Sequence, residues 1–363
     1  MQSSDDEQWH EEEEVIDLHA IMRAFGVQDW HNLGPAEGAP SAQLSLLIDI
    51  QGERYLLKER QEVPIAADPH HRYAFQHYLQ QQGIPIPPLR LTPQGEPFVA
   101  IGEDYFELQQ LPGGEIFSSA APQASHWIEH AGRMLGRIHL ASQHYQGPQH
   151  RWPSEVHIGA LVQGWLNLAR SKADQLTLQP LSTALSHWAD QWEAVLPSAM
   201  MSIGATHGLP EFHIHGDYHA HNLRFGPFGV VAVLGLEASR WEKRIFEVAF
   251  ALFSFSALQW ETQDGRTRPL TKRGLEPEYA RRFLHAYAEL CPPARGEAAL
   301  LSEALTLVAP IATINGPLED LFFSAYSLDE EALLNDMLER LTWASALPSW
   351  LTRVKRSLAE MWA

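Results

Sequence analysis

The hydrophobic pattern of this 363-residue chain changes at Pro112-Gly113-Gly114, and this change limits its possible folds more than any other feature. Before it, short apolar runs separated by turn residues indicate β-strands and a few helices. After it, apolar residues recur at helical spacing over long segments. We therefore predict an α+β protein in which a small antiparallel sheet domain joins a large helical domain. Ligands preferentially bind in the cleft between two such domains.

Local patterns predict the individual elements. The turn Gln51-Gly52-Glu53 joins two apolar runs into a β-hairpin, and Gly83 with the prolines that follow it ends a helix. In the first third, helices are expected over residues 15–25 and His70–Gln82, and strands over Leu44–Ile50, Arg54–Lys58, Phe98–Ile101 and Tyr105–Leu108. Later helical periods are His126–Ser142, Val156–Lys172, Leu181–Val195, Glu278–Leu290 and Leu328–Leu347, interrupted by one short strand pair within residues 213–233.

Charge and cysteine content exclude several classes of protein. The formal net charge of −19 would repel nucleic acids and anionic lipid surfaces, so we expect neither as a partner. Cys291 is the only cysteine, which excludes an intramolecular disulfide framework and any multi-cysteine zinc site. The chain begins with an acidic segment where a secretory signal would be basic and then apolar. No uninterrupted apolar run approaches ~18 residues, so we expect a cytoplasmic protein that does not span a membrane.

The densest group of polar residues is His213-Ile214-His215-Gly216-Asp217-Tyr218-His219-Ala220-His221-Asn222-Leu223-Arg224-Phe225. One interpretation is a loop near a strand that holds several histidines by chance. Another is a metallohydrolase, in which alternating histidines and Asp217 would share one face of an extended strand as metal ligands. The metallo-β-lactamase pattern has a histidine directly after the aspartate, where this chain has Tyr218. The third interpretation is the catalytic loop of a kinase.

The pattern His-Gly-Asp-x-His-x-x-Asn resembles the catalytic loop of the aminoglycoside phosphotransferase and choline kinase-like family, which has a bilobal protein-kinase-like fold. The resemblance implies that Asp217 accepts or orients the proton of an attacking hydroxyl and that the amide oxygen of Asn222 holds Mg²⁺. A carboxylate suits the proton, and a hard oxygen suits the cation. His215, the other residue of the catalytic set, would brace the loop by hydrogen bonds.

The resemblance extends over residues 30–255 and implies an ATP site. Lys58 corresponds to the family's strand lysine, which contacts the nucleotide phosphates. The small residues of the segment Gly34 to Ser41 would let backbone N–H groups, including that of Ser41, approach phosphate. The backbone around Gln109, Gln110 and Leu111 would pair with adenine. The segment Met134–His139 resembles a family helix that ends in leucine and histidine, for which we expect a packing role.

The chain departs from the family near the metal site. Gly235 stands where the family has a Mg²⁺-binding aspartate, and glycine offers no side-chain ligand. Glu237 stands where many relatives carry a second acid, so it becomes the candidate metal ligand beside Asn222. Downstream, Glu247 replaces an aspartate at a position that mostly supports structure.

The helix expected over His70–Gln82 also departs from the family, because it lacks the acid that commonly pairs with the strand lysine. Glu59, Glu62 or the nucleotide phosphate alone would then position Lys58.

These observations predict an ATP- and Mg²⁺-dependent phosphotransferase that acts on a hydroxyl group of a small molecule. The expected divisions are an acidic segment with a helix (1–29), an N-lobe (30–111) and a helical C-lobe (112–363) that holds the catalytic loop 213–225 and the acceptor site. Gly235 leaves three explanations open: a non-catalytic binding or scaffold protein, an active enzyme in which Glu237 supplies the ligand, or a substituted version of an active parent. We expect Gly235→Asp to increase phosphoryl transfer.

Overall fold

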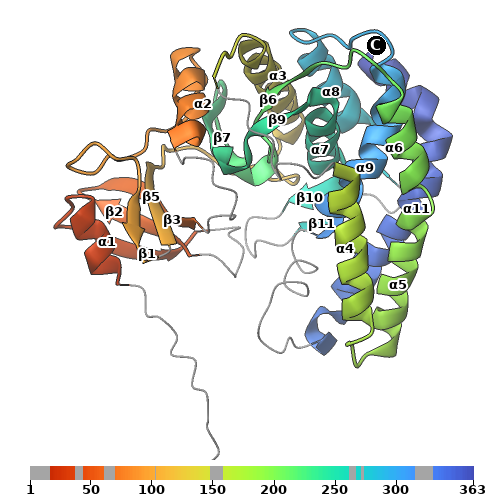
Figure 1. Ribbon diagram of the computed structural model, residues 1–363, viewed down its shortest axis with the longest axis horizontal. Helices are drawn as coiled ribbons and strands as arrows, with labels where there is room; N and C mark the ends of the chain where they lie inside the picture. The colour runs from red at the N-terminus through yellow and green to blue at the C-terminus, as the bar shows by residue number, and fades with distance from the viewer. Residues whose placement is uncertain are drawn as a thin grey trace, which may run out of the picture.

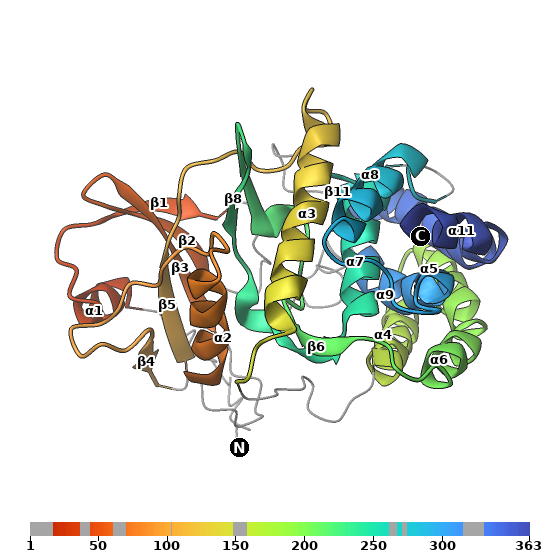
Figure 2. The same cartoon turned by 90° about the horizontal axis from the view of Figure 1, so that it is seen from above.

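The computed structural model describes residues 17–36, 44–60, 70–102, 104–147, 158–260, 267–270, 274–314 and 330–363. A five-stranded sheet with two helices forms one side of the molecule, and most of the helices form the other (Figures 1 and 2). The helices are α1 (Leu18–Ala24), α2 (His70–Gln81), α3 (Ala124–Ser142), α4 (Ile158–Ala173), α5 (Gln179–Glu193), α6 (Leu196–Gly204), α7 (Arg244–Ala257), α8 (Pro277–Ala288), α9 (Leu301–Ile314) and α11 (Glu330–Trp362). This arrangement confirms the predicted α+β class.

The sheet has the order β1-β2-β3-β5-β4, and all neighbouring strands are antiparallel. Its strands are β1 (His31–Pro35), β2 (Ser45–Ile50), β3 (Glu53–Arg60), β4 (Val99–Ile101) and β5 (Asp104–Gln110). The turn at Gln51 and Gly52, both with positive φ, closes the predicted hairpin of β2 and β3. Strand β3 lies at the centre of the sheet, which places Lys58 between Ser45 of β2 and Glu107 of β5.

Strand β1 was not expected. Gly34 lies in this strand, next to a bulge in its pairing with β2, although the sequence placed it in a loop. The rest of that loop, including Ser41, lies outside the described residues.

Two hydrophobic clusters correspond to the two sides of the molecule. The smaller one packs Ile21 of α1 and Phe25, directly after this helix, against Ile48, Leu57 and Leu108 of the sheet. The larger one joins the helices that follow residue 123, and α2 also contributes to it through Phe75 and Leu79. Helix α2 therefore links the sheet to the helical side. None of the helices in the described residues is long and apolar enough to cross a membrane.

Short strand pairs surround the segment that the sequence singled out. The sequence predicted one pair, but β6 (Glu211–Ile214) pairs with β9 (Arg240–Lys243), β7 (Leu223–Gly226) pairs with β8 (Gly229–Val233), and β10 (Leu258–Trp260) pairs with β11 (Thr267–Pro269). Residues 215–222 connect β6 to β7. The 3₁₀ turn η1 (Ala220–Asn222) ends this connection, η2 (Leu236–Ala238) follows β8, and η3 (Ala298–Leu300) precedes α9.

Candidate functional site

His215 fixes the loop after β6 through hydrogen bonds at both ring nitrogens. Its Nε2 donates to the carbonyl oxygen of Leu234 at 2.7 Å, and its Nδ1 accepts from the backbone N–H of Asp217 at 3.2 Å. The side chain is fully buried, and burial lowers the pKa of His215. A neutral ring is required here because Nδ1 must keep a lone pair to accept the Asp217 N–H.

Glu247 of α7 also fixes the backbone of this loop. Its carboxylate accepts the backbone N–H groups of His215, at 3.1 Å, and of Gly216, and it also accepts from Nε2 of His139 at 2.7 Å. The hydroxyl of Tyr287 lies 2.8 Å from Nδ1 of His139 and completes a buried network. Burial alone would raise the pKa of Glu247, but the hydrogen bond and charge of His139 outweigh it, so the pKa is lowered. His139, for which the sequence predicted packing, is therefore a hydrogen-bonding part of this support.

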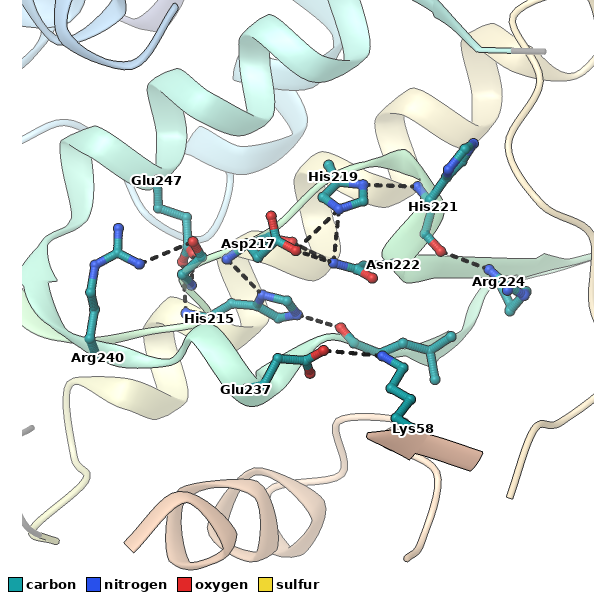
Figure 3. Close-up of polar contacts among 12 residues, drawn as sticks. Lys58, His215, Asp217, His219, His221, Asn222, Arg224, Glu237, Arg240 and Glu247 are labelled. Carbon is teal, nitrogen blue, oxygen red and sulfur yellow. Dashed lines mark hydrogen bonds and ion pairs between the residues drawn. The ribbon is translucent and has the colours of Figure 1, made fainter. Parts of the chain in front are cut away.

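The Asp217 carboxylate is oriented by two side chains that converge on Oδ2. His219 Nε2 lies 3.2 Å from this oxygen, and Asn222 Nδ2 lies 2.8 Å from it (Figure 3). Nδ1 of His219 accepts the backbone N–H of His221, which leaves the proton on Nε2, where it faces Asp217. Burial alone would raise the pKa of Asp217, but the interaction with His219 outweighs it and the pKa is lowered. The carboxylate is therefore ionised at neutral pH.

The side chain of Asn222 lies in the space next to Gly235. Its Nδ2 also donates to the backbone oxygen of Asp217 at 2.8 Å, and its Oδ1 makes no hydrogen bond to the described residues. Gly235 has a φ of 79°, and a Cβ there would lie 2.3 Å from Nδ2 and 2.8 Å from Oδ1 of Asn222. An aspartate at this position would therefore displace the Asn222 amide, a steric overlap that the sequence alone does not show.

Lys58 forms an ion pair with Glu237, an acid that the sequence did not propose as its partner. Its Nζ lies 3.1 Å from Oε1 of Glu237, and this ion pair connects β3 with the turn η2 (Figure 3). The carboxylate of Glu59 accepts the N–H of Leu44 instead, and Glu62 lies outside the described residues. The structure therefore shows Glu237, and not Glu59, in an ion pair with Lys58, because the lysine side chain reaches across to the segment after β8. A role for Glu62 stays a prediction.

Helix α2 supplies a tyrosine where the sequence lacks an acid. Tyr73 donates its hydroxyl to Oε1 of Glu107 at 2.6 Å, and Glu107 stands opposite Lys58 in the register of β3 and β5. Helix α2 also contacts the turn η2 that carries Glu237. Helix α2 thus lacks an acid, and Lys58 pairs with an acid from the turn η2 instead.

The backbone at the end of β5 is already hydrogen-bonded. The N–H of Gln110 donates to Pro88 O at 3.0 Å, and that of Leu111 donates to Arg54 O at 2.8 Å. The side chain of Gln109 donates to Pro87 O at 3.1 Å. Pairing of adenine with residues 109–111 stays a prediction, and use of either backbone N–H would require it to leave a protein carbonyl.

The histidine metal site is wrong. Among the described residues, which include all of 213–225, no group of three or more His, Cys, Asp or Glu side chains can hold a metal ion. His213 packs against Phe75, with ring centroids 4.6 Å apart. His219 stacks on Trp260 and His221 meets the edge of the same ring. The backbone is not uniformly extended, so the alternating side chains do not converge.

Comparison with known proteins identifies the family. Residues 41–308 match the model of the phosphotransferase enzyme family, whereas no curated protein matches the chain. An aminoglycoside phosphotransferase structure from Alicyclobacillus acidocaldarius is similar with a TM-score of 0.61 and 14% identity, over 95% of this chain and 97% of that one. A microcompartment-associated aminopropanol kinase is similar with a TM-score of 0.58 and 12% identity, over 93% and 96%. A choline kinase from Cryptosporidium parvum is similar with a TM-score of 0.55 and 13% identity, over 92% and 90%.

These likenesses confirm the predicted bilobal, protein-kinase-like fold. The family match covers more than half of the chain, including the strand lysine and the whole loop 213–225. The chain belongs to the phosphotransferase enzyme family.

Proposed function

We propose that this chain transfers the terminal phosphoryl group of ATP to a hydroxyl group of a small molecule. The observation that carries the proposal is the contact between Lys58 and Glu237. It brings the central strand of the sheet to the segment that also borders Asn222, whose amide is bonded to Asp217. A phosphate-binding cation and a hydroxyl-orienting carboxylate are the groups that phosphoryl transfer requires from a protein.

Asp217 is the proposed catalytic group. Because its pKa is lowered, it is a weak base, and its main effect is to orient the acceptor hydroxyl toward the phosphoryl group. Such orientation suffices because enzymes catalyse phosphoryl transfer mainly by positioning the reactants and stabilising charge. His215 and Glu247 hold the loop backbone that carries Asp217.

Nucleotide and metal contacts complete the proposal. Lys58, Ser41 and the backbone of Gln109, Gln110 and Leu111 would contact ATP. The Oδ1 of Asn222 and the carboxylate of Glu237 are hard oxygen donors that suit Mg²⁺, which usually keeps waters and substrate phosphates as its other ligands. When bound, the ion neutralises charge on the phosphate oxygens. A structurally similar amicoumacin kinase forms a complex with AMP-PNP and Ca²⁺, which supports the proposal that this fold binds a nucleotide together with a divalent ion.

The test is ATP consumption with a panel of small amines, amino alcohols and sugars that carry hydroxyl groups. Asp217→Ala serves as the blank, and Glu289→Gln, in an exposed ion pair with Arg133, serves as a matched surface control. We expect turnover in the native chain and in the control but not in the blank. Equal rates in the native chain and in Asp217→Ala would refute the proposal.

A non-catalytic nucleotide-binding protein is the second candidate, and Gly235 is the observation that favours it. Thermal-shift titration with ATP, with and without Mg²⁺, separates the two candidates when it is combined with the turnover assay. Stabilisation by ATP without any turnover across the panel would favour the binding protein. No stabilisation at millimolar ATP would argue against both.

A further inference from the structure

We propose that Glu237 serves two cations in turn: Lys58 while the site is empty, and the divalent ion once nucleotide binds. The ion and the nucleotide would then load together, and metal-free nucleotide would bind poorly. This inference rests on the proposed function, because it concerns how the same site admits its nucleotide.

The ion pair of Lys58 and Glu237 is the first part of the argument. The two side chains are only 18% and 29% exposed, so their charges are partly removed from water. Separating such a pair is unfavourable unless each charge finds a new partner. Two other acids lie near Lys58 among the described residues: Glu59 accepts the Leu44 N–H, and Glu107 accepts the Tyr73 hydroxyl. Glu237 is the acid whose ion pair with Lys58 the structure shows, so it neutralises Lys58 before nucleotide binds.

The metal side of the site depends on the same residue. Gly235 contributes no ligand, and Oδ2 of Asp217 is bonded to His219 and Asn222. Asn222 Oδ1 is neutral, so it cannot balance the charge of a divalent ion. In the proposal Glu237 balances this charge, so a single acid pairs with Lys58 in one state and would bind the ion in the other.

Charge balance predicts how this shared acid selects its ligand. A nucleotide without metal brings only negative charge, which competes for Lys58 and is repelled by Glu237. A nucleotide with a divalent ion brings a phosphate for Lys58 and a cation for Glu237 at the same time. Both charges exchange partners and neither is left uncompensated.

Calorimetric titration of the full-length protein with ATP tests this selection, once in EDTA and once in excess Mg²⁺. The measured quantity is the ratio of the two dissociation constants. We expect the native chain to bind ATP about tenfold more tightly with Mg²⁺, and Glu237→Gln to bring the ratio close to one. That variant should bind metal-free ATP more tightly than the native chain and Mg²⁺–ATP more weakly. The matched control Glu59→Gln should keep the native ratio.

A role limited to positioning Lys58 would give a different result. Glu237→Gln would then weaken both forms of ATP equally and keep the ratio, and this outcome would overturn the inference while leaving the proposed function intact. If the native chain bound no ATP in either condition, the proposed function would fail.

A second measurement tests the inference in the absence of nucleotide. Lys58→Met removes the cation that pairs with Glu237, so Mn²⁺ alone, followed by electron paramagnetic resonance, should bind more tightly to the variant than to the native chain. Equal or weaker Mn²⁺ binding would show that Glu237 does not exchange Lys58 for the ion.

Discussion

Substitution of Gly235 by aspartate tests the link between backbone conformation and the metal site. The glycine has a φ of 79°, where a residue with a Cβ is strained by about 1–2 kcal/mol. The new Cβ also overlaps the Asn222 amide, and loss of the charge-assisted bond from this amide to Asp217 costs about 1.5–3 kcal/mol. We therefore expect the free energy of unfolding to fall by about 3 kcal/mol, which lowers Tm by roughly 4 °C in a chain of this size.

Gly235→Ala is the matched control because it adds the same Cβ without a carboxylate. In EDTA, Gly235→Asp should have a lower Tm than Gly235→Ala. Its new carboxylate adds a third negative charge beside Asp217 and Glu237 and has no counter-ion of its own. Excess Mg²⁺ should raise the Tm of Gly235→Asp and leave that of Gly235→Ala unchanged. The increase in phosphoryl transfer that the sequence predicts for Gly235→Asp requires the gain of a metal ligand to exceed the loss of the Asn222 bond to Asp217.

Differential scanning calorimetry of the three proteins, in EDTA and in Mg²⁺, measures these shifts. A native-like Tm for Gly235→Ala would refute the argument from strain and overlap. An equal Mg²⁺ shift in both variants would refute the argument that the aspartate binds the ion.

Two further predictions concern the support of the loop. Glu247→Gln should lower the free energy of unfolding by about 3–5 kcal/mol, because it breaks a buried charged network with His139 and two backbone N–H groups. Urea unfolding measures this loss, and a loss smaller than that of the exposed Glu289→Gln would contradict the prediction. His221 has its pKa lowered to about 3, mainly by burial, against 6.5 in the unfolded chain. As pH falls below 6.5, the unfolded chain gains a proton that the folded chain does not, so His221 removes up to about 1.4 kcal/mol of stability per pH unit. His221→Gln should flatten the decline in unfolding free energy between pH 6.5 and 5, and parallel declines in both proteins would contradict the assignment.

The sequence predicted the local features well because their determinants lie close together in the chain. The hairpin of β2 and β3 depends on one turn and two adjoining apolar runs, and the structure contains it. The loop residues His215, Asp217 and Asn222 form a contiguous pattern, and their side chains and backbones are bonded to one another as neighbours. Gly34 was misplaced because a bulge lets a turn-forming residue sit inside β1.

Contacts between distant segments were beyond sequence reasoning. Lys58 and Glu237 are 179 positions apart, and His139 and Glu247 are 108 positions apart. No local periodicity connects such pairs, because the tertiary fold alone brings them together. A buried histidine on an otherwise apolar helix face was the available signal for His139, but it did not indicate Glu247 as the partner.

The two departures near the metal site and in α2 are parts of one structural feature. Glycine at position 235 adopts the left-handed conformation that opens the 3₁₀ turn Leu236–Ala238, so the chain leaves the extended path of β8 at that point. A residue two positions after Gly235 would share its direction only in an extended chain, and the turn instead brings Glu237 to Lys58. Gly235 thus removes one carboxylate from the expected metal site. It also begins the turn that brings the carboxylate of Glu237 to Lys58, which has no acidic partner in α2. Substitutions at Gly235 and Glu237 should consequently be non-additive, since each alters the partner available to the other.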